Sequence, residues 1–492
     1  MLYPSKKDFI KLAKKGNLIP VYSEILADFE TPLSAYRKIG ASGYSFLLES
    51  VEGGERIARY SFLGGDPSTI FSSKGGKVTI RESGASRTYS SKDPIEELKK
   101  LLARYKFVKV SGLPRFSGGL VGFFGYDIIR FIEDIPDKNP DTLDLPDSLF
   151  MLTDTILIFD HVDHKIKVVS NAHVKKNAAS AYDDAEKKIK SLIARLKDSS
   201  RGKAPAAPVN NSRRPPVIRS NFTKDGFRKA VIEAKRYIKA GDIIQVVLSQ
   251  RLETSTNSDP FQVYRALRSI NPSPYMYHLK MGGFCLVGSS PEIMVRCEEG
   301  RVELRPIAGT RPRGVGEEDD ARLEEELLKD PKERAEHIML VDLGRNDLGK
   351  VCDYSSIKVS DLMTVEKYSH VMHIVSDVSG RLRKGRDAFD VIRATIPAGT
   401  VTGAPKVRAM EIIDELEKVR RSTYAGSVGY FSFSGNLDCC ITIRTILMKK
   451  KMAYIQAGAG IVADSVPSRE YKETMNKAGA LVKAIQMAEE GL

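Results

Sequence analysis

Two pairs of glutamates, far apart in the chain, have the spacing of a divalent-cation site built on helices. Glu333 and Glu336 lie in one stretch of helical character, and Glu470 and Glu473 lie in another near the end of the sequence. Residues three apart project from the same face of a helix, so both carboxylates of a pair are presented together. Carboxylate oxygens are the ligands that Mg²⁺ prefers, with positions left for water and an acidic substrate. Two such helix starts facing each other would form a magnesium site.

Glutamates at this spacing are also ordinary on a solvated helix surface, and the residues around the first pair favour the site. Segment 338–343 is too apolar for a surface helix, and the polar run 344–347 that follows needs partners if it is buried. Pro331 suits the first position of a helix, and Ser468 suits an N-cap. Each pair is therefore predicted in a first helical turn, where negative charge is favoured.

The composition indicates a globular protein of one large or two ordinary domains, since 42% of the 492 residues are hydrophobic and 28% are charged. No apolar run approaches the length that spans a membrane, and the first residues lack the apolar core of a signal peptide. We therefore expect a cytoplasmic protein without membrane association. The five cysteines have no metal-ligand spacing and are interpreted as buried, reduced thiols.

The formal net charge of +14 would suit nucleic acid, a membrane surface or an anionic small molecule as partner. The basic residues are spread through mixed helices instead of gathering in a basic arm, so solubility explains most of the charge. A nucleic-acid-binding protein is the minority interpretation.

Strand-rich stretches broken by long helices predict an α+β fold, with antiparallel sheets that carry helices on their outer faces. Segments 44–50 and 58–64 are expected to be strands joined by a Gly53-Gly54 turn. The small, polar stretch 198–216 is predicted to be a flexible linker between residues 1–197 and 217–492. The glycine series at 117–127 alternates small and large residues, which is typical of a strand that another backbone approaches closely.

A series of motifs in the second half closely resembles the chorismate-utilising enzymes, and most closely the anthranilate synthase component I family. The motifs are GSSPE at 288–292, RPIAGTRPRG at 305–314, DPKERAEHIMLVDLGRND at 330–347, VMH at 371–373, PAGTVTGAPK at 397–406, ITIRT at 441–445, QAGAGIV at 456–462 and REYKETMNKA at 469–478. The likeness covers residues 220–490 and extends more loosely through residues 20–160. It implies two interlocked layers of mainly antiparallel sheet, with residues 1–197 as a regulatory domain and 217–492 as the chorismate-binding catalytic domain.

This family is Mg²⁺-dependent and acts on the dicarboxylate chorismate. The resemblance implies that Glu336 and Glu473 bind the metal, with Glu333 and Glu470 beside them, and that Arg444 binds the enolpyruvyl carboxylate. Alternation along a strand would place Arg444 on the same face as Thr442. The other implied substrate-binding residues are Gly309, Thr310, Tyr424, Gly458, Ala459 and Gly460.

The implied reaction adds ammonia at ring C2, expels the C4 hydroxyl and then eliminates pyruvate to give anthranilate, the first step of tryptophan biosynthesis. Glu292 would protonate the leaving hydroxyl, and His373 would assist the elimination, with Thr400 and Lys477 completing the catalytic set. From the residues alone, Glu292 could instead cap the segment that follows it. His373, within an apolar run, is interpreted from the residues alone as a core histidine.

Two positions separate the branches of the family. Water-using relatives carry a lysine where Gln245 stands, and glutamine cannot accept a proton from water. Aminodeoxychorismate synthases carry a nucleophilic lysine where this chain has Ala308. Both residues favour anthranilate synthesis, with aminodeoxychorismate synthesis as the alternative.

The chain has no Gly-x-Cys-x-Gly nucleophile, so the resemblance implies that a separate glutamine amidotransferase subunit supplies the ammonia. Segment 47–50 together with 271–276 resembles the family's inhibitory site for L-tryptophan. The residues implied there are Glu49, Ser50, Pro274, Tyr275 and Met276.

Overall fold

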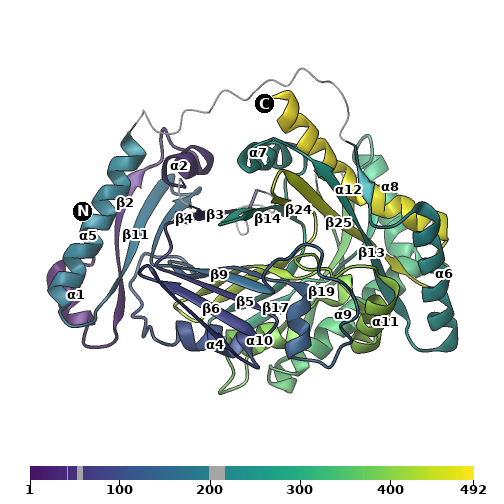
Figure 1. Ribbon diagram of the computed structural model, residues 1–492, viewed down its shortest axis with the longest axis horizontal. Helices are drawn as coiled ribbons and strands as arrows, with labels where there is room; N and C mark the ends of the chain where they lie inside the picture. The colour runs from purple at the N-terminus through teal and green to yellow at the C-terminus, as the bar shows by residue number, and fades with distance from the viewer. Residues whose placement is uncertain (41–42, 52–58, 199–216, 369–370) are drawn as a thin grey trace.

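The computed structural model describes residues 1–40, 43–51, 59–198, 217–368 and 371–492. The predicted Gly53-Gly54 turn and all but the first residue of the predicted linker 198–216 lie outside these ranges. The described strands form two large, mainly antiparallel sheets, and the described helices cover their outer faces, as the sequence predicts. In Figure 1 the first sheet arches over the second.

The strands of the first sheet, in spatial order, are β1 (Leu2–Tyr3), β2 (Leu18–Leu26), β11 (Lys165–His173), β10 (Thr155–Asp160), β4 (Tyr60–Gly65), β3 (Tyr44–Glu49), β14 (Tyr275–Met281), β15 (Phe284–Ser290), β24 (Thr445–Lys449), β25 (Met452–Ile461), β13 (Gln245–Ser255) and β12 (Arg219–Ser220), with β21 (Gly403–Ala404) pairing to β13. Those of the second sheet are β18 (Ile307–Pro312), β20 (Val371–Arg381), β17 (Arg301–Leu304), β16 (Ile293–Glu298), β23 (Leu437–Ile441), β22 (Ser427–Ser432), β8 (Gly119–Phe124), β9 (Ser148–Thr153), β5 (Thr69–Lys74), β6 (Lys77–Glu82) and β7 (Ala85–Ser90), with β19 (Lys358–Lys367) pairing to β20.

Both halves of the chain contribute strands to both sheets. In the first sheet β3 pairs with β14, and in the second sheet β8 pairs with β22. The layers are therefore interlocked, because each sheet is continuous only when the two halves are present. The domain boundaries at 197 and 217 stay a prediction.

The helices lie outside the two sheets. They are α1 (Lys6–Leu12), α2 (Pro32–Ile39), α4 (Pro94–Leu102), α5 (Ala178–Lys197), α6 (Lys224–Ala240), α7 (Pro260–Ile270), α8 (Glu317–Lys329), α9 (Pro331–Gly349), α10 (Ala388–Thr395), α11 (Lys406–Leu416) and α12 (Pro467–Glu490). Figure 1 shows α5, α7 and α12 outside the arch of the first sheet, and α4 and α10 beneath the second. One apolar core, which includes Phe46, Phe123 and Leu286, lies between the sheets, and the other apolar clusters fill the spaces between each sheet and its helices. Within the described residues, no helix is both long and apolar enough to cross a membrane.

The glycine series at 117–127 forms β8, and the predicted close approach of another backbone is confirmed. A Cβ built on Gly122 would lie 2.0 Å from the carbonyl oxygen of Leu149 in β9. Strand β22, the other neighbour of β8, has the same feature. A Cβ on its Gly429 would lie 2.2 Å from the carbonyl oxygen of Asp438 in β23. Only glycine fits at such positions, so these residues allow the second sheet to form where the two halves meet.

Helix α9 begins as predicted, with Pro331 in its first turn and the Asp330 carboxylate capping the backbone N–H groups of Lys332 and Glu333. The prediction for α12 is wrong in one respect. That helix begins at Pro467 and follows Val466, so Ser468 already lies inside it and no side chain caps it. A proline in the first turn starts the helix without a cap because its fixed φ suits the helix and its missing N–H needs no partner.

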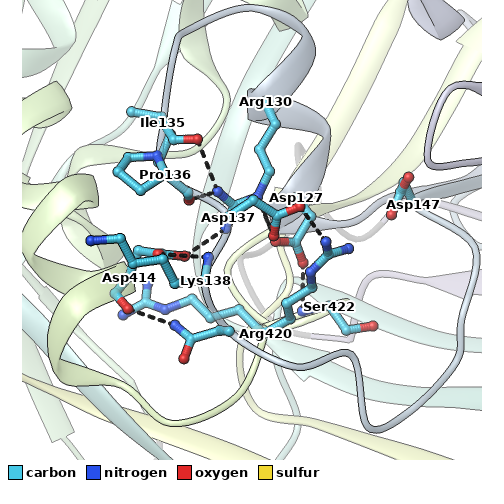
Figure 2. A network of polar contacts seen from close by, with 12 residues as sticks. Asp127, Arg130, Ile135, Pro136, Asp137, Lys138, Asp147, Asp414, Arg420 and Ser422 are labelled. Carbon is cyan, nitrogen blue, oxygen red and sulfur yellow. Dashed lines mark hydrogen bonds and ion pairs between the residues drawn. The ribbon is translucent and has the colours of Figure 1, made fainter.

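A polar network joins loop 125–147 of the N-terminal half to α11 and to the turn after it (Figure 2). Arg130 donates to Asp414 at 2.9 Å and to Asp127 at 3.2 Å, and Asp127 in turn accepts from the backbone N–H of Ser422 at 3.1 Å. Arg420 forms an ion pair with Asp137. Burial raises the pKa of Asp127 to about 6, against the opposing effect of Arg130 and Arg420. The network fixes the turn that leads to Tyr424.

Candidate active site

The candidate site is built where the chain crosses between the two sheets, close to the starts of α9 and α12. Glu292 lies in the crossing from β15 to β16, and Arg444 lies in the crossing from β23 to β24. The crossings are hydrogen-bonded to each other. Ile441 donates its backbone N–H to the carbonyl of Glu292 at 3.0 Å, and Ser289 donates to the carbonyl of Arg444 at 3.1 Å. The structure thus brings the expected acid and the expected carboxylate-binding cation to the same place.

Arg444 does not lie in a strand, so the predicted alternation with Thr442 is wrong. Residues 442–444 form a bend, and Arg444 has a φ of +50°, in the left-handed region. The bend is required because β23 and β24 belong to different sheets, and the chain must turn to pass from one to the other. The bend carries the guanidinium into electrostatic contact with Tyr424, Glu473 and Glu292, all of which oppose the lowering of its pKa by burial.

Glu292 is a buried carboxyl group that holds its proton at neutral pH. Its side chain is 8% exposed, and loss of hydration raises its pKa to about 8. The Thr400 hydroxyl and the cations Lys477 and Arg444 act in the opposite direction. Glu292 and Thr400 line a common cavity of about 40 Å³. A protonated carboxyl with a pKa near the working pH is suited to donate a proton to a leaving group.

The four glutamates of the predicted metal site lie near the starts of α9 and α12, where Glu336 and Glu470 each interact electrostatically with Glu473. Burial raises the pKa of Glu336, and the nearby carboxylates Glu333 and Glu473 raise it further. Burial likewise raises the pKa of Glu470, with a further contribution from Glu473. A Cβ on Gly460 of β25 would lie 3.9 Å from Oε1 of Glu336. Helix α9 therefore presents Glu336 to the glycine-rich strand β25, which is expected to hold substrate.

Some of these glutamates already have cationic partners. Glu333 accepts from Arg311 at 3.2 Å, and Glu473 pairs with Lys477 at 2.7 Å. Within the described ranges, no three His, Cys, Asp or Glu side chains lie close enough together to hold a metal ion. Magnesium commonly takes only one or two carboxylates and completes its shell with water and substrate oxygens. Carboxylates that raise one another's pKa are a donor set of the right chemistry for this ion, because a divalent cation would relieve their repulsion.

Lys477 and Tyr424 fix the backbone around Gly458. The Nζ atom of Lys477 donates to the carbonyl of Gly458 at 3.0 Å while it also pairs with Glu473. A Cβ on Gly458 would lie 2.6 Å from the Tyr424 hydroxyl, so a side chain there would displace the tyrosine. Ala459 lies between Gly458 and Gly460 on β25, where it is paired with Leu248 of β13 and fully buried. Burial raises the pKa of Tyr424 to about 12, so this hydroxyl remains protonated and can donate a hydrogen bond.

His373 lies on β20 opposite Thr310 of β18. Its Nδ1 is 3.0 Å from the carbonyl oxygen of Gly309 and 3.0 Å from the Thr310 hydroxyl. Burial lowers the pKa of His373, and the Arg444 cation adds to this effect. A neutral ring that donates from Nδ1 to the carbonyl presents Nε2 as a base. Gly309 adopts a φ of +74° at a bulge, and this conformation favours glycine.

An ion pair that sequence reasoning missed holds the elements of the site together. Arg421 is fully buried and donates to Glu417, to the carbonyl of Val401 at 2.7 Å and to the carbonyl of Val247 at 2.6 Å. Glu417 also accepts from the backbone N–H of Ser249 at 2.8 Å. The pair therefore ties β13 to the turn that carries Thr400. An Arg and a Glu four residues apart are common on exposed helices. The spacing of Arg421 and Glu417 therefore does not reveal from the sequence that the pair is buried and joins these elements.

A second, larger cavity of about 550 Å³ is lined by all five residues expected at the inhibitory site. Glu49 on β3 is paired with Met276 on β14, so the cavity joins the two halves of the chain. The Glu49 carboxylate accepts hydrogen bonds from Tyr264 and Arg268. Other lining residues were not predicted, because they come from segments remote in sequence. They include Arg59, Pro114, Arg296, Tyr430, Asp438 and Cys440.

Comparison with known proteins gives a consistent result. The model of a family described as chorismate binding enzyme matches residues 44–483. Anthranilate synthase component 1 of Acetivibrio thermocellus is 51% identical over 492 residues, which cover both chains completely. The protein of that name from Aquifex aeolicus (strain VF5) is 50% identical and covers 99% of this chain and 98% of its own. The crystal structure of anthranilate synthase component I from Streptococcus pneumoniae TIGR4 superposes with a TM-score of 0.75 at 37% identity, covering 93% of this chain and 99% of that one.

Proposed function

The chain belongs to the chorismate-binding enzymes, and we propose on this basis that it is the ammonia-using component of an anthranilate synthase in tryptophan biosynthesis. It converts chorismate and ammonia to anthranilate, pyruvate and water. The observation that carries the proposal is the proximity of a protonated, buried Glu292 to the Arg444 guanidinium, which is half-buried and forms no ion pair among the described residues. A dianionic substrate supplies the missing negative charge, and its leaving hydroxyl needs the proton.

The side chains divide the work between charge neutralisation and proton transfer. Arg444 binds the enolpyruvyl carboxylate, and Tyr424 and the backbone N–H groups near Gly458 and Gly460 orient the ring. Glu336 and Glu473, supported by Glu333 and Glu470, hold Mg²⁺, which when bound supplies positive charge for the ring carboxylate. Ammonia forms the new bond at C2, and Glu292 gives its proton to the C4 hydroxyl, which leaves as water.

The second stage removes a proton from C2 as the bond to the enolpyruvyl oxygen breaks. His373, neutral and with Nε2 available, is the base that assists this elimination. Pyruvate leaves and the ring becomes aromatic. Lys477 keeps its hydrogen bond to the Gly458 carbonyl and thereby holds the strand against Glu473.

The choice of ammonia over other nucleophiles follows from what the pocket lacks. Gln245 lies beside Gly460, where a Cβ would be 2.6 Å from its Nε2, and its amide cannot act as a base toward water. Ala308 offers no covalent nucleophile. Both residues disfavour isochorismate and aminodeoxychorismate as products.

Two further features belong to the same proposal. A separate glutamine amidotransferase subunit delivers ammonia to this chain, because the sequence contains no Gly-x-Cys-x-Gly nucleophile. L-Tryptophan binds in the 550 Å³ cavity and inhibits the enzyme, and the presence of all five expected residues in its wall supports this.

The proposal is tested by incubating the purified chain with chorismate, MgCl₂ and an ammonium salt while recording anthranilate fluorescence. Turnover should appear with ammonium alone, should require glutamine plus the amidotransferase when ammonium is withheld, and should stop when EDTA is added. A folded chain that shows no fluorescence under the first condition would contradict the proposal.

A further inference from the structure

Arg311 is a residue of the 305–314 motif to which the chemistry described so far gives no role. It lies on β18, directly after Gly309 and Thr310, which are expected to hold substrate. Its side chain is 19% exposed, and each of its three guanidinium nitrogens donates to a carboxylate. These carboxylates belong to α8, to α9 and to the residue that joins the two helices. Arg311 therefore connects the substrate-binding strand to the helix that carries Glu336.

The three carboxylates surround the guanidinium at hydrogen-bond distance. Nε donates to Glu326 of α8 at 3.1 Å, Nη2 donates to Asp330 at 2.8 Å, and Nη1 donates to Glu333 of α9 at 3.2 Å. Hydrogen bonds between two charged groups are about twice as strong as neutral ones. Because one planar group makes all three contacts, the carboxylates are held in a fixed arrangement around it.

The contact with Asp330 fixes the start of α9. Oδ1 of this aspartate accepts from the backbone N–H groups of Lys332 at 3.0 Å and Glu333 at 3.3 Å, while Oδ2 accepts from Arg311. One carboxylate thus serves as the N-cap of the helix and as an ion-pair partner of the strand. Glu336 lies in the next turn of the same helix, so the position of its carboxylate depends on this connection.

The contact with Glu333 turns this carboxylate toward β18. Oε1 accepts from Arg311, and Oε2 faces the Gly309 bulge, where a Cβ would lie 3.4 Å away. Glu333 shares a helix face with Glu336 and interacts with it electrostatically. In the described part of the chain, no other Lys or Arg forms an ion pair with Glu333. A carboxylate close enough to join the metal site is therefore held on the strand side by a single cation.

We propose that Arg311 determines the metal selectivity of the site by keeping Glu333 out of the coordination sphere of the ion. The inference rests on the metal site of the proposed function. With Glu333 withheld, Glu336 and Glu473 are the carboxylates left for the ion, and Mg²⁺ prefers one or two carboxylates with water and substrate completing its shell. A third carboxylate favours Ca²⁺, which takes more oxygen ligands, and it repels the anionic ring of the substrate.

The test compares the binding of Mg²⁺ and of Ca²⁺ to the parent and to Arg311→Met by calorimetry, without substrate. The parent should bind Mg²⁺. In the variant the ratio of Ca²⁺ affinity to Mg²⁺ affinity should rise by about tenfold, because the released Glu333 adds a ligand that Ca²⁺ uses better. An unchanged ratio in a variant that keeps the circular dichroism of the parent would overturn this inference alone. A parent that binds no Mg²⁺ would overturn the metal site as well.

A second substitution separates the released carboxylate from a displaced helix. Arg311→Met combined with Glu333→Gln should return the ratio to that of the parent, because the added ligand is gone. A ratio that stays high in the double variant would show that Arg311 acts by another route, against the inference.

Arg313→Met is the matched control. Arg313 directly follows β18 and pairs with Asp320 of α8 at 2.5 Å, but it forms no ion pair with α9 among the described residues. This variant should keep the ratio of the parent. A rise equal to that of Arg311→Met would show that the loss of any arginine from this strand suffices, and would overturn the inference.

A measurement on the parent does not depend on how the variants fold. Crystals grown with Mn²⁺, which replaces Mg²⁺ and gives an anomalous signal, should show oxygens of Glu336 and Glu473 at coordination distance from the anomalous peak, about 2.1 Å. Glu333 should remain hydrogen-bonded to Arg311. Direct coordination of the ion by Glu333 in the parent would overturn the inference.

Discussion

Glu292 and Arg444 occupy neighbouring crossings between the two sheets, and each lies within electrostatic reach of the other. Neither residue lies in a regular strand. The sheets hold the crossings in register through the hydrogen bonds from Ile441 to Glu292 and from Ser289 to Arg444. The proposed proton donor and the proposed substrate-binding cation are thus positioned by the same structural feature.

The raised pKa of Glu292 predicts the pH dependence of turnover. A general acid must be protonated, so kcat/KM should hold below about pH 8 and fall as the pH rises through that value. Glu292→Gln should keep the fold and lose turnover by about 10²-fold or more, which a pH-rate profile and circular dichroism would check. A profile that stays flat to pH 10 would show that another group donates the proton.

The same pKa predicts that the stability of the fold also falls as the pH rises. A carboxyl whose folded pKa lies above its unfolded value binds more protons in the folded state between about pH 4.5 and 8. Its contribution to stability therefore declines as the pH rises through that window. Glu292→Gln lacks this decline, so its unfolding temperature should exceed that of the parent most clearly at pH 8 to 9. Equal pH dependence in the two proteins would contradict the burial of an ionisable group there.

Removing a metal carboxylate should abolish metal dependence without unfolding the chain. Glu336→Gln and Glu473→Gln are each expected to lose Mg²⁺-stimulated turnover and measurable Mg²⁺ binding by calorimetry, because the repulsion that draws the cation is gone. The matched control is Glu325→Gln, on the exposed face of α8, where the glutamate pairs only with Lys329. Normal Mg²⁺ titration curves for the first two variants would remove the metal assignment.

The 550 Å³ cavity that we propose as the tryptophan site, called the inhibitory cavity below, predicts that a larger residue at position 50 excludes tryptophan. Ser50 lines this cavity, and Glu292 does not, so Ser50→Phe should raise the tryptophan concentration for half inhibition by about tenfold or more with little loss of turnover. Ser180→Phe, an exposed substitution on α5, serves as the control. Equal inhibition of the Ser50 variant and the parent would place the inhibitor elsewhere.

Variants of the buried ion pair Arg421–Glu417 should distinguish its contribution to stability from its role in positioning the site. Arg421→Met leaves Glu417 buried and unpaired. The free energy of unfolding, measured in urea, should therefore fall by about 3–5 kcal/mol. Arg421→Met combined with Glu417→Met should recover much of that loss. Turnover should remain low in both, because the carbonyls of Val247 and Val401 lose the donor that holds β13 and the Thr400 turn together. Recovery of turnover together with stability would indicate a purely structural role.

The sequence predicted what depends on local pattern and on motifs. The α+β architecture, the start of α9 at Pro331 and the five buried thiols are all confirmed. These follow from alternation, from capping chemistry and from the absence of ligand spacing, each of which is contained in a few neighbouring residues.

The errors and omissions arise where distant segments decide the structure. The alternation that placed Arg444 on a strand fails because β23 and β24 belong to different sheets, which no local pattern reveals. Arg421 was missed because its partners Val247 and Val401 lie far away in sequence. The same holds for Asp438 in the inhibitory cavity, where Tyr275 donates to it at 2.9 Å across 163 residues.

The central claim is that Arg444, Glu292 and the carboxylate cluster together direct ammonia to chorismate, and the identity of the product tests it most directly. The parent chain, given chorismate, MgCl₂ and ¹⁵N-labelled ammonium, should yield anthranilate carrying one ¹⁵N atom by mass spectrometry, with pyruvate in equal amount. An unlabelled product such as isochorismate, or a labelled product that retains the enolpyruvyl group, would contradict the account.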